Sequence, residues 1–317
     1  MNDQNQAVLC GDIGGTNTRL ALAQHDGSML AFSARRQYAN ASVASLAECI
    51  SDFLNHCSRP TRACLAIAGP TDGRVAALTN LPWQIDADEI SRDFGFPTRL
   101  INDFEAVGWG LDALGPQHLH TLQSGEPISH APRVALGPGT GLGVALSVWS
   151  GNGYRPMPGE GGHIGLAPTD ADQADLLQFL QNRFGRVSVE RILSGPGIVD
   201  LYAYCRAASG LPEVPEADAA GITQAALANI DADAVHAMKL FCRILGQTAG
   251  DLALVAGARA GIYIAGGIPP RILPLLDDGE LIAGLRDKGR FSEWVSAVPV
   301  QVVTDPDLGL KGAALAR

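Results

Sequence analysis

The stretch VLCGDIGGTNTRLALA, residues 8–23, interrupts an apolar segment with an acidic residue, three glycines, two threonines and an asparagine. Residues 8–10 and 20–23 have the apolar character of β-strands, and Gly-Gly is common in the turn of a hairpin. A loop with so little side-chain bulk also lets backbone N–H groups approach an anion, and Asp12 at its start can hold a cation. The stretch alone therefore fits both a plain hairpin and a phosphate-binding turn.

A second stretch repeats this pattern later in the chain. GTNTRLA, residues 15–21, is matched by GTGLGVA, residues 139–145, and each copy lies between two apolar segments. Repetition of one strand–loop–strand unit indicates two related structural halves. We therefore expect an α/β chain whose two halves face each other across a cleft.

The composition limits the class of protein and its partners. A chain of 317 residues with 46% hydrophobic residues can bury enough apolar surface for two domains. Its formal net charge of −10 disfavours nucleic acid and anionic membranes as partners. The start of the chain has no signal-peptide pattern, the longest apolar region is interrupted by Arg259, and the six cysteines form no CxxC pair. These features favour a cytoplasmic protein with reduced, mostly buried thiols.

Further along the chain, apolar patterns alternate between strand and helix. Asp103 is expected where a strand runs into a helix, at the edge of a sheet where functional side chains often lie. We expect buried strands over residues 64–70 and 261–268, a strand followed by a helix over residues 99–110, helices over residues 172–185 and 194–208, and a long amphipathic helix from Asp231.

Several familiar nucleotide-binding motifs are absent from the sequence. It contains no GK dipeptide, no G-x-G-x-x-G window and no HRD, so a Walker A loop, a dinucleotide fingerprint and a protein-kinase catalytic loop are all excluded. Only three lysines occur, and none lies in a glycine-rich loop. Any bound phosphate would therefore be held by backbone N–H groups, hydroxyls and Mg²⁺.

Seven segments, taken in order, resemble the bacterial glucokinase family. They are CGDIGGTNTRLALA, LTNLPW, INDFEAVGWG, GTGLGVA, PGEGGHIGLAP, ERILSGPGIVDLY and IYIAGGI. The resemblance implies the duplicated actin/hexokinase-like (ribonuclease H-like) α/β architecture with an inter-domain cleft. It implies a small domain of residues 1–112 plus 304–317 and a large domain of residues 113–303. It also implies that the last residues, 305–317, pack on the first half. Pro138 departs from the pattern, because a small residue is expected there and proline lacks the N–H that could bind phosphate.

The resemblance also implies a role for individual residues. Asp103 would be the general base that takes the proton of the sugar 6-hydroxyl, although an aspartate at a helix start is commonly a cap. Asp12 would orient Mg²⁺ through water. ATP and its phosphates would be bound by Gly11, Asp12, Ile13, Gly14, Gly15, Thr16, Asn17, Gly139, Thr140, Gly141, Gly266 and Gly267. Glucose would be bound by Asn102, Asp103, Glu160, His163 and Glu190, with Asn80 as a weaker candidate.

The function that the resemblance implies is ATP-dependent phosphorylation of glucose at the 6-hydroxyl, the first step of glycolysis. No cysteine follows His163 before Cys205, so the chain resembles the zinc-free group of these kinases. A homodimer is implied, as is closure of the two halves around the sugar to exclude water. Two alternatives remain open: a kinase for another hexose or an N-acetylated aminosugar, and a non-catalytic sugar sensor with the same fold.

Overall fold

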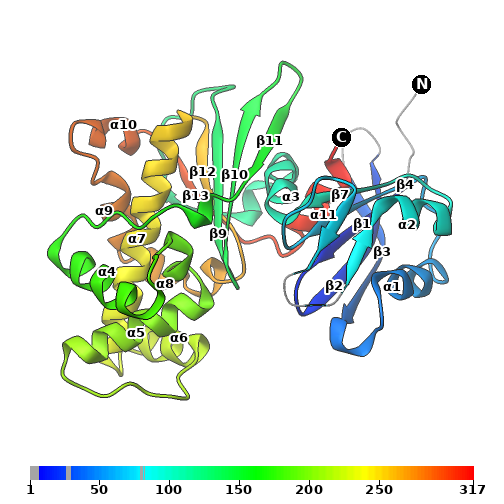
Figure 1. Ribbon diagram of the computed structural model, residues 1–317. Helices are drawn as coiled ribbons and strands as arrows, with labels where there is room; N and C mark the ends of the chain where they lie inside the picture. The colour runs from blue at the N-terminus through cyan, green and yellow to red at the C-terminus, as the bar shows by residue number, and fades with distance from the viewer. Residues whose placement is uncertain (1–6, 26–29, 79–80, 82) are drawn as a thin grey trace. The chain divides into compact units, whose positions relative to one another are not determined.

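The computed structural model describes residues 7–25, 30–78, 81 and 83–317. The chain divides into two compact units. The first unit contains residues 1–116, 153–158 and 305–317, and the second contains residues 117–152 and 159–304. Each unit is built around its own β-sheet (Figure 1).

The sheet of the first unit combines an antiparallel meander with two parallel strands. Its strand order is β3-β2-β1-β4-β7, in which β1 pairs antiparallel with β2 and parallel with β4. The strands are β1 (Val8–Ile13), β2 (Asn17–His25), β3 (Leu30–Ala39), β4 (Arg62–Ile67) and β7 (Thr98–Asn102). A separate antiparallel pair consists of β5 (Val75–Ala77) and β6 (Gln84–Asp86).

Helices cover both faces of this sheet. Side chains alternate between the faces along each strand, and apolar side chains on both faces are buried. Leu9 and Ile13 pack with α1 (Leu46–Leu54) and α2 (Ala87–Phe94) on one face. Val8 and Cys10 pack with α3 (Asp103–Gly110) and α11 (Leu308–Leu315) on the other. Asp12 therefore belongs to the face covered by α3 and α11. Short 3₁₀ turns complete the unit: η1 (Asn40–Ser42) and η2 (Leu111–Ala113), with η3 (Pro116–His118) at its boundary.

The C-terminal segment packs on the first unit, as the sequence predicts. A Cβ at Gly312 would lie 1.7 Å from the carbonyl oxygen of Ala106, so the absence of a side chain there lets α11 approach α3 closely. The Arg62 guanidinium on β4 donates to the carbonyls of Ala314 and Ala316, at 2.9 and 3.3 Å. The last helix is thus fixed to the strands that carry Asp12.

The sheet of the second unit repeats the strand arrangement of the first. Its order is β11-β10-β9-β12-β13-β8, and β9 pairs antiparallel with β10 and parallel with β12, as β1 does with β2 and β4. The strands are β8 (Leu119–Gln123), β9 (Arg133–Pro138), β10 (Leu142–Trp149), β12 (Gly261–Ile264) and β13 (Val300–Val303), all of the second unit, and β11 (Tyr154–Gly159), whose residues up to Pro158 are counted with the first unit. The five-strand pattern β11-β10-β9-β12-β13 matches β3-β2-β1-β4-β7, so the repeat seen in the sequence is a structural duplication.

A long central helix organises the rest of the second unit (Figure 1). It is α7 (Ala232–Ala256), the long helix predicted from Asp231, and the Asp231 carboxylate caps its start. The other helices are α4 (Ala171–Phe184), α5 (Gly195–Ala208), α6 (Ala219–Leu227), α8 (Leu273–Leu276), α9 (Glu280–Arg286) and α10 (Ser292–Ser296). The 3₁₀ turns are η4 (Gly161–His163), η5 (Val189–Arg191), η6 (Pro269–Arg271) and η7 (Gly289–Phe291). The predicted helix start in SGPG is confirmed, because Ser194 is the N-cap of α5.

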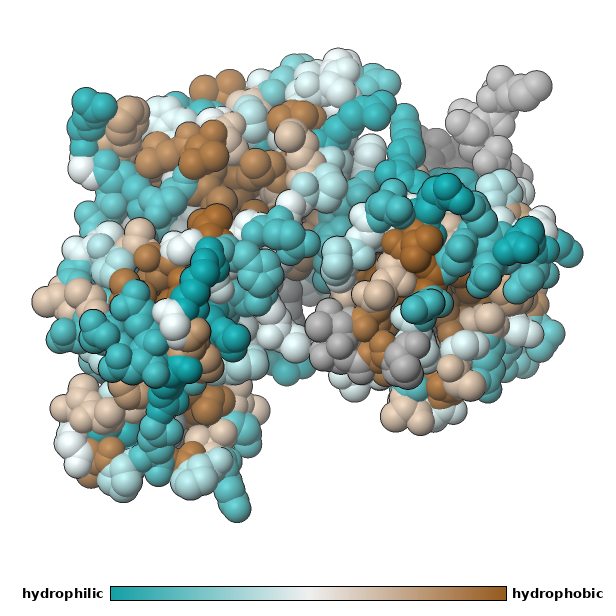
Figure 2. Space-filling model, in the orientation of Figure 1, coloured by the Kyte–Doolittle hydropathy of each residue, from teal (hydrophilic) through white to brown (hydrophobic). Residues whose placement is uncertain are grey.

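All six cysteines lie within the described residues and are free thiols, and only Cys57 is not fully buried. Burial raises the pKa of the Cys64 thiol to about 12. No helix among the described residues is long and apolar enough to span a membrane. On the face drawn in Figure 2, hydrophobic groups occur on both units among hydrophilic residues.

Candidate active site

The first glycine turn, residues 14–17, closes the hairpin between β1 and β2. The Gly14 N–H donates to the Asn17 carbonyl at 3.0 Å, so the segment forms the β-hairpin that its sequence predicts. Asn40, only 3% exposed, holds this turn from behind. Its side-chain N–H donates to the Gly14 carbonyl at 2.8 Å and its backbone N–H to the Thr16 carbonyl at 2.9 Å. The carbonyls are thereby turned towards Asn40, an arrangement that favours presentation of N–H groups on the opposite side.

Asp12 lies at the end of β1, next to this turn. Its carboxylate forms an ion pair with the Arg19 guanidinium, which also donates to the Pro306 carbonyl at 2.7 Å. A Cβ at Gly309 would lie 3.2 Å from the Asp12 carboxylate, so only a small residue leaves this space. Asp12 is therefore a fixed, charge-paired carboxylate whose side chain is still 21% exposed.

Asp103 leaves the same edge of the sheet as the first glycine turn. The register pairs Ile13 with Ile67 and Ile67 with Asn102, so β1, β4 and β7 end at one level. Two strand spacings separate Ile13 from Asn102, which is about 10 Å. Asp103 is the next residue, and its half-buried side chain thus belongs to the sheet edge that carries Asp12.

The helix cap at this junction is Asn102 rather than Asp103. The Asn102 side-chain oxygen accepts from the N–H groups of Phe104 and Glu105, at 2.8 and 3.2 Å, and its amide N–H donates to the Gly69 carbonyl at 3.2 Å. Asn102 therefore fills the N-cap position, while the Asp103 carboxylate also accepts from the Phe104 N–H at 2.9 Å. Asp103 is the first residue of α3, where the helix dipole stabilises a carboxylate.

The second glycine turn, residues 139–141, joins β9 to β10 in the corresponding position of the second unit. The Gly139 N–H donates to the Gly141 carbonyl at 2.8 Å, and Pro138 has no N–H. Two of the backbone donors that a phosphate could use are thus absent or already occupied. Those of Thr140 and Gly141 have no hydrogen-bond partner among the described residues.

Glu190 on η5 supports the second glycine turn directly. One of its carboxylate oxygens accepts from the Leu142 N–H at 2.9 Å, immediately after the turn. A Cβ at Gly141 would lie 2.5 Å from that same oxygen, so glycine is required for this approach. The other carboxylate oxygen of Glu190 lies 4.0 Å from Nδ1 of His163. Glu190 therefore joins a predicted phosphate turn to a predicted sugar ligand.

Glu160 precedes the 3₁₀ turn η4 and His163 is its last residue, and η4 lies against β10. A Cβ at Gly161 would be 2.8 Å from Cβ of Val144, and one at Gly162 would be 2.2 Å from the Leu142 carbonyl oxygen. The two glycines thus allow η4 to approach the strand, and the His163 side chain at its end lies near Glu190. Glu160 and His163 are exposed, as residues that bind a ligand from solution must be before it arrives.

Gly266 and Gly267 follow β12 at the same sheet edge as the second glycine turn. Gly266 has φ +89°, and a Cβ there would lie 2.6 Å from the Pro138 carbonyl oxygen. Gly267 faces open space instead. It lines a pocket of about 930 Å³ together with Gly139 and Thr140.

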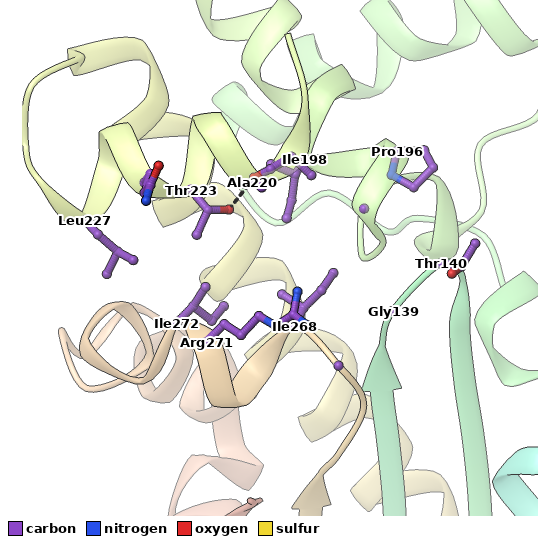
Figure 3. A pocket seen from close by; sticks show the side chains of 14 residues that line it. Gly139, Thr140, Pro196, Ile198, Ala220, Thr223, Leu227, Ile268, Arg271 and Ile272 are labelled. Carbon is purple, nitrogen blue, oxygen red and sulfur yellow. Dashed lines mark hydrogen bonds between the residues drawn. The ribbon is translucent and has the colours of Figure 1, made fainter. Parts of the chain in front are cut away.

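This pocket, shown in Figure 3, lies entirely within the second unit. The labelled residues of α5 and α6, among them Ile198 and Thr223, line it opposite those of η6. Its walls are mostly apolar, and the second glycine turn forms one end. An apolar slot that leads to a turn with free N–H groups is suited to a nucleoside phosphate.

Three residues of these sites are missing from the sequence-based prediction. Asn40 and Arg271 act through a contact distant in sequence and through position on a pocket wall, and no motif marks them; Arg19 lies within the first glycine-rich stretch, but its contact with the Pro306 carbonyl is not visible from the sequence. Among predicted candidates, Asn80 lies outside the described residues. Gly11, Ile13 and Asn17 belong to β1 and β2 beside the first glycine turn.

Asp12 has the chemistry of a magnesium ligand. Mg²⁺ is bound in phosphoryl-transfer sites by one or two carboxylates together with substrate phosphates and waters. A partly exposed carboxylate next to a glycine turn fits that donor set. Within the described ranges, no group of three or more His, Cys, Asp or Glu side chains could by itself hold a metal ion.

Comparison with known proteins agrees with this geometry. The sequence profile of the glucokinase family matches residues 9–317. A glucokinase from Caulobacter sp. (strain K31) is 40% identical over 311 residues, covering 97% of this chain and 94% of the relative. Among solved structures, a glucokinase from an Antarctic psychrotroph is 34% identical with a TM-score of 0.90 over 98% of both chains.

A glucokinase from Balamuthia mandrillaris, solved in complex with glucose, is 27% identical with a TM-score of 0.81, over 98% of this chain and 92% of that one. The expected duplicated actin/hexokinase-like architecture is thereby confirmed. A profile match over nearly the whole sequence, together with 40% identity to a curated relative, leads to one assignment. The chain belongs to the glucokinase family.

Proposed function

We propose that this glucokinase phosphorylates glucose at its 6-hydroxyl with ATP, and that Asp103 is the general base. The observation that carries the proposal is the common sheet edge of the first unit, from which both Asp103 and the first glycine turn emerge. A base and a phosphate-binding turn must lie within reach of one substrate for a hydroxyl to attack a phosphate. The family match over residues 9–317 supports the same reaction.

In this proposal the sugar is bound by residues from both units. Asn102 and Asp103 come from the first unit, and Glu160, His163 and Glu190 from the second. The spare amide N–H of Asn102 donates, the carboxylates accept, and the imidazole serves in either role, so together they complement sugar hydroxyls. Asp103 accepts the proton of the 6-hydroxyl as that oxygen attacks the γ-phosphorus and ADP leaves.

The nucleotide is bound by backbone donors of the two glycine turns and by the pocket beside Gly267. Thr140 and Gly141 offer the unpaired N–H groups of the second turn. Asp12 would hold Mg²⁺, through water, and the metal would supply charge neutralisation for the phosphates. Because Arg19 pairs with Asp12, this carboxylate is already oriented before the metal arrives.

The remaining features belong to the same proposal. The protein acts as a zinc-free cytoplasmic homodimer, and its partners are glucose and ATP rather than nucleic acid or membrane. Residues 1–112 with 304–317 and residues 113–303 act as two domains that close around the sugar and exclude water. Exclusion of water prevents hydrolysis of ATP.

The test is ADP release measured with a panel of hexoses and N-acetylated aminosugars. We expect glucose to give the highest kcat/KM and chelation of Mg²⁺ to abolish turnover. Preference for another sugar would assign the enzyme to that substrate instead. Tight sugar binding without ADP release would identify a sensor and refute the proposal.

A further inference from the structure

Among the described residues that line the pocket beside Gly267, Arg271 alone has an ionisable side chain. The fourteen lining residues otherwise carry aliphatic, glycine, proline, threonine and glutamine side chains, and none carries an aromatic ring. A purine base is a flat ring, and another flat group such as an aromatic side chain or a guanidinium can stack on its face. In this pocket the guanidinium of Arg271 and the amide of Gln224 are the only planar side-chain groups.

Arg271 is held so that its side chain follows the pocket wall. It ends η6, where its N–H donates to the Ile268 carbonyl at 2.9 Å, and the next residue, Ile272, is fully buried. Figure 3 shows its side chain lying beside those of Ile268 and Ile272. The backbone is therefore anchored, while the side chain itself is exposed in the pocket.

The guanidinium of Arg271 has no acidic partner. It makes no ion pair or side-chain hydrogen bond with any residue that the structure describes, whereas Arg243 and Arg183 in the same unit each pair with two carboxylates. An unpaired, exposed guanidinium in an apolar slot is available to a ligand. Its planar, weakly hydrated surface stacks well on an aromatic face.

The opposite wall of the pocket, formed by α5 and α6, is mostly apolar, with the Gln224 amide and the Thr223 hydroxyl as its polar groups. The Thr223 hydroxyl donates to the Ala219 carbonyl at 2.6 Å within α6, so its proton is already used. Leu227, 39% exposed, lies one helical turn further on. A flat ring between this wall and η6 would meet Leu227 and Ile198 on one side and Arg271 on the other.

We propose that Arg271 stacks on the base of the nucleotide and thereby sets the affinity for its nucleoside part. The alternative contact, with the phosphates, is disfavoured because the second glycine turn lies at one end of the pocket and supplies their N–H donors. Arg271 instead lies among Ile268 and Ile272 on the wall. The inference rests on the proposed ATP-dependent function and names a nucleotide-binding residue for it.

The experiment compares the binding of adenosine and ADP by calorimetry in the unsubstituted protein, Arg271→Ala and Arg271→Lys. A cation–π contact of about 0.5–2 kcal/mol corresponds to a factor of about 2–30 in affinity. We expect Arg271→Ala to weaken the binding of adenosine and the binding of ADP by the same factor, at low and at high salt. Arg271→Lys should recover only part of the affinity that Arg271→Ala loses. In steady-state kinetics, Arg271→Ala should raise the KM for ATP, while kcat and the KM for glucose stay unchanged.

Arg290→Ala is the matched control, because Arg290 is also exposed, lies in the same unit and does not line the pocket. It should leave both affinities unchanged. Loss of ADP affinity without loss of adenosine affinity would assign Arg271 to the phosphates and overturn the inference, as would no change in either. Absence of ADP binding and glucose turnover in the unsubstituted protein would instead refute the proposed function.

Discussion

Replacing Asn40 with alanine removes two side-chain hydrogen bonds behind the first glycine turn. The Gly14 carbonyl loses its donor at 2.8 Å, and the Thr18 hydroxyl, fully buried, loses its acceptor at 2.8 Å. A buried polar group left without a partner costs about 1–3 kcal/mol, so the two together predict about 2–6 kcal/mol of lost stability. The turn should also become less ordered, which raises the KM for ATP at saturating glucose.

Urea unfolding followed by tryptophan fluorescence measures the first effect, because Trp83 and Trp109 report on this unit. Asn55→Ala is the matched control: Asn55 is exposed in the same unit, and its change should stay within about 0.5 kcal/mol. Equal midpoints for the Asn40 and Asn55 variants would refute the hydrogen-bond reasoning. A large stability loss with an unchanged KM for ATP would show that this turn does not bind the nucleotide.

Three further predictions concern the second unit. Gly266→Ala forces a Cβ into the carbonyl oxygen at the end of β9 at a positive φ, so we expect a loss of about 2–4 kcal/mol in the same unfolding assay. Glu190→Gln weakens the acceptor for the Leu142 N–H, and steady-state kinetics should show higher KM values for both glucose and ATP, because the residue joins the two sites. The Tyr202 hydroxyl and two backbone N–H groups lower the pKa of Asp231, so this carboxylate stabilises the fold above its unfolded pKa and loses that effect as pH falls through the lower folded value. Asp231→Ala should therefore cost about 1 kcal/mol at neutral pH and progressively less below about pH 4, measured by unfolding midpoints across pH.

Local chemistry made much of the fold predictable from the sequence. Ser194 and Asp231 are capping residues directly before apolar helical patterns, and both helices start where those residues predict. The two glycine turns were identifiable because each interrupts an apolar strand with residues of little bulk. Element ends were less predictable: the strand expected over residues 64–70 spans Arg62–Ile67, because its pairing with β1 and β7 decides its extent.

The parts of the site that depend on distant contacts could not be predicted in this way. Asn40 holds a turn more than twenty residues earlier, and Arg19 connects Asp12 to the Pro306 carbonyl. The N-cap position considered for Asp103 is occupied by Asn102, because α3 begins at Asp103, one residue later. The residue at which the strand ends and the helix begins thus decides which side chain caps the helix. Such choices depend on packing across the sheet, which a single sequence does not display.

Asp103→Asn tests the central claim most directly, with glucose binding and ADP release measured on the same sample. Asparagine keeps the size and position of the side chain but cannot take a proton from the 6-hydroxyl. We predict near-normal glucose affinity by calorimetry and a fall in kcat of about 10²- to 10⁴-fold. Glucose-dependent ADP release at the rate of the unsubstituted enzyme would contradict the assignment of Asp103 as the base.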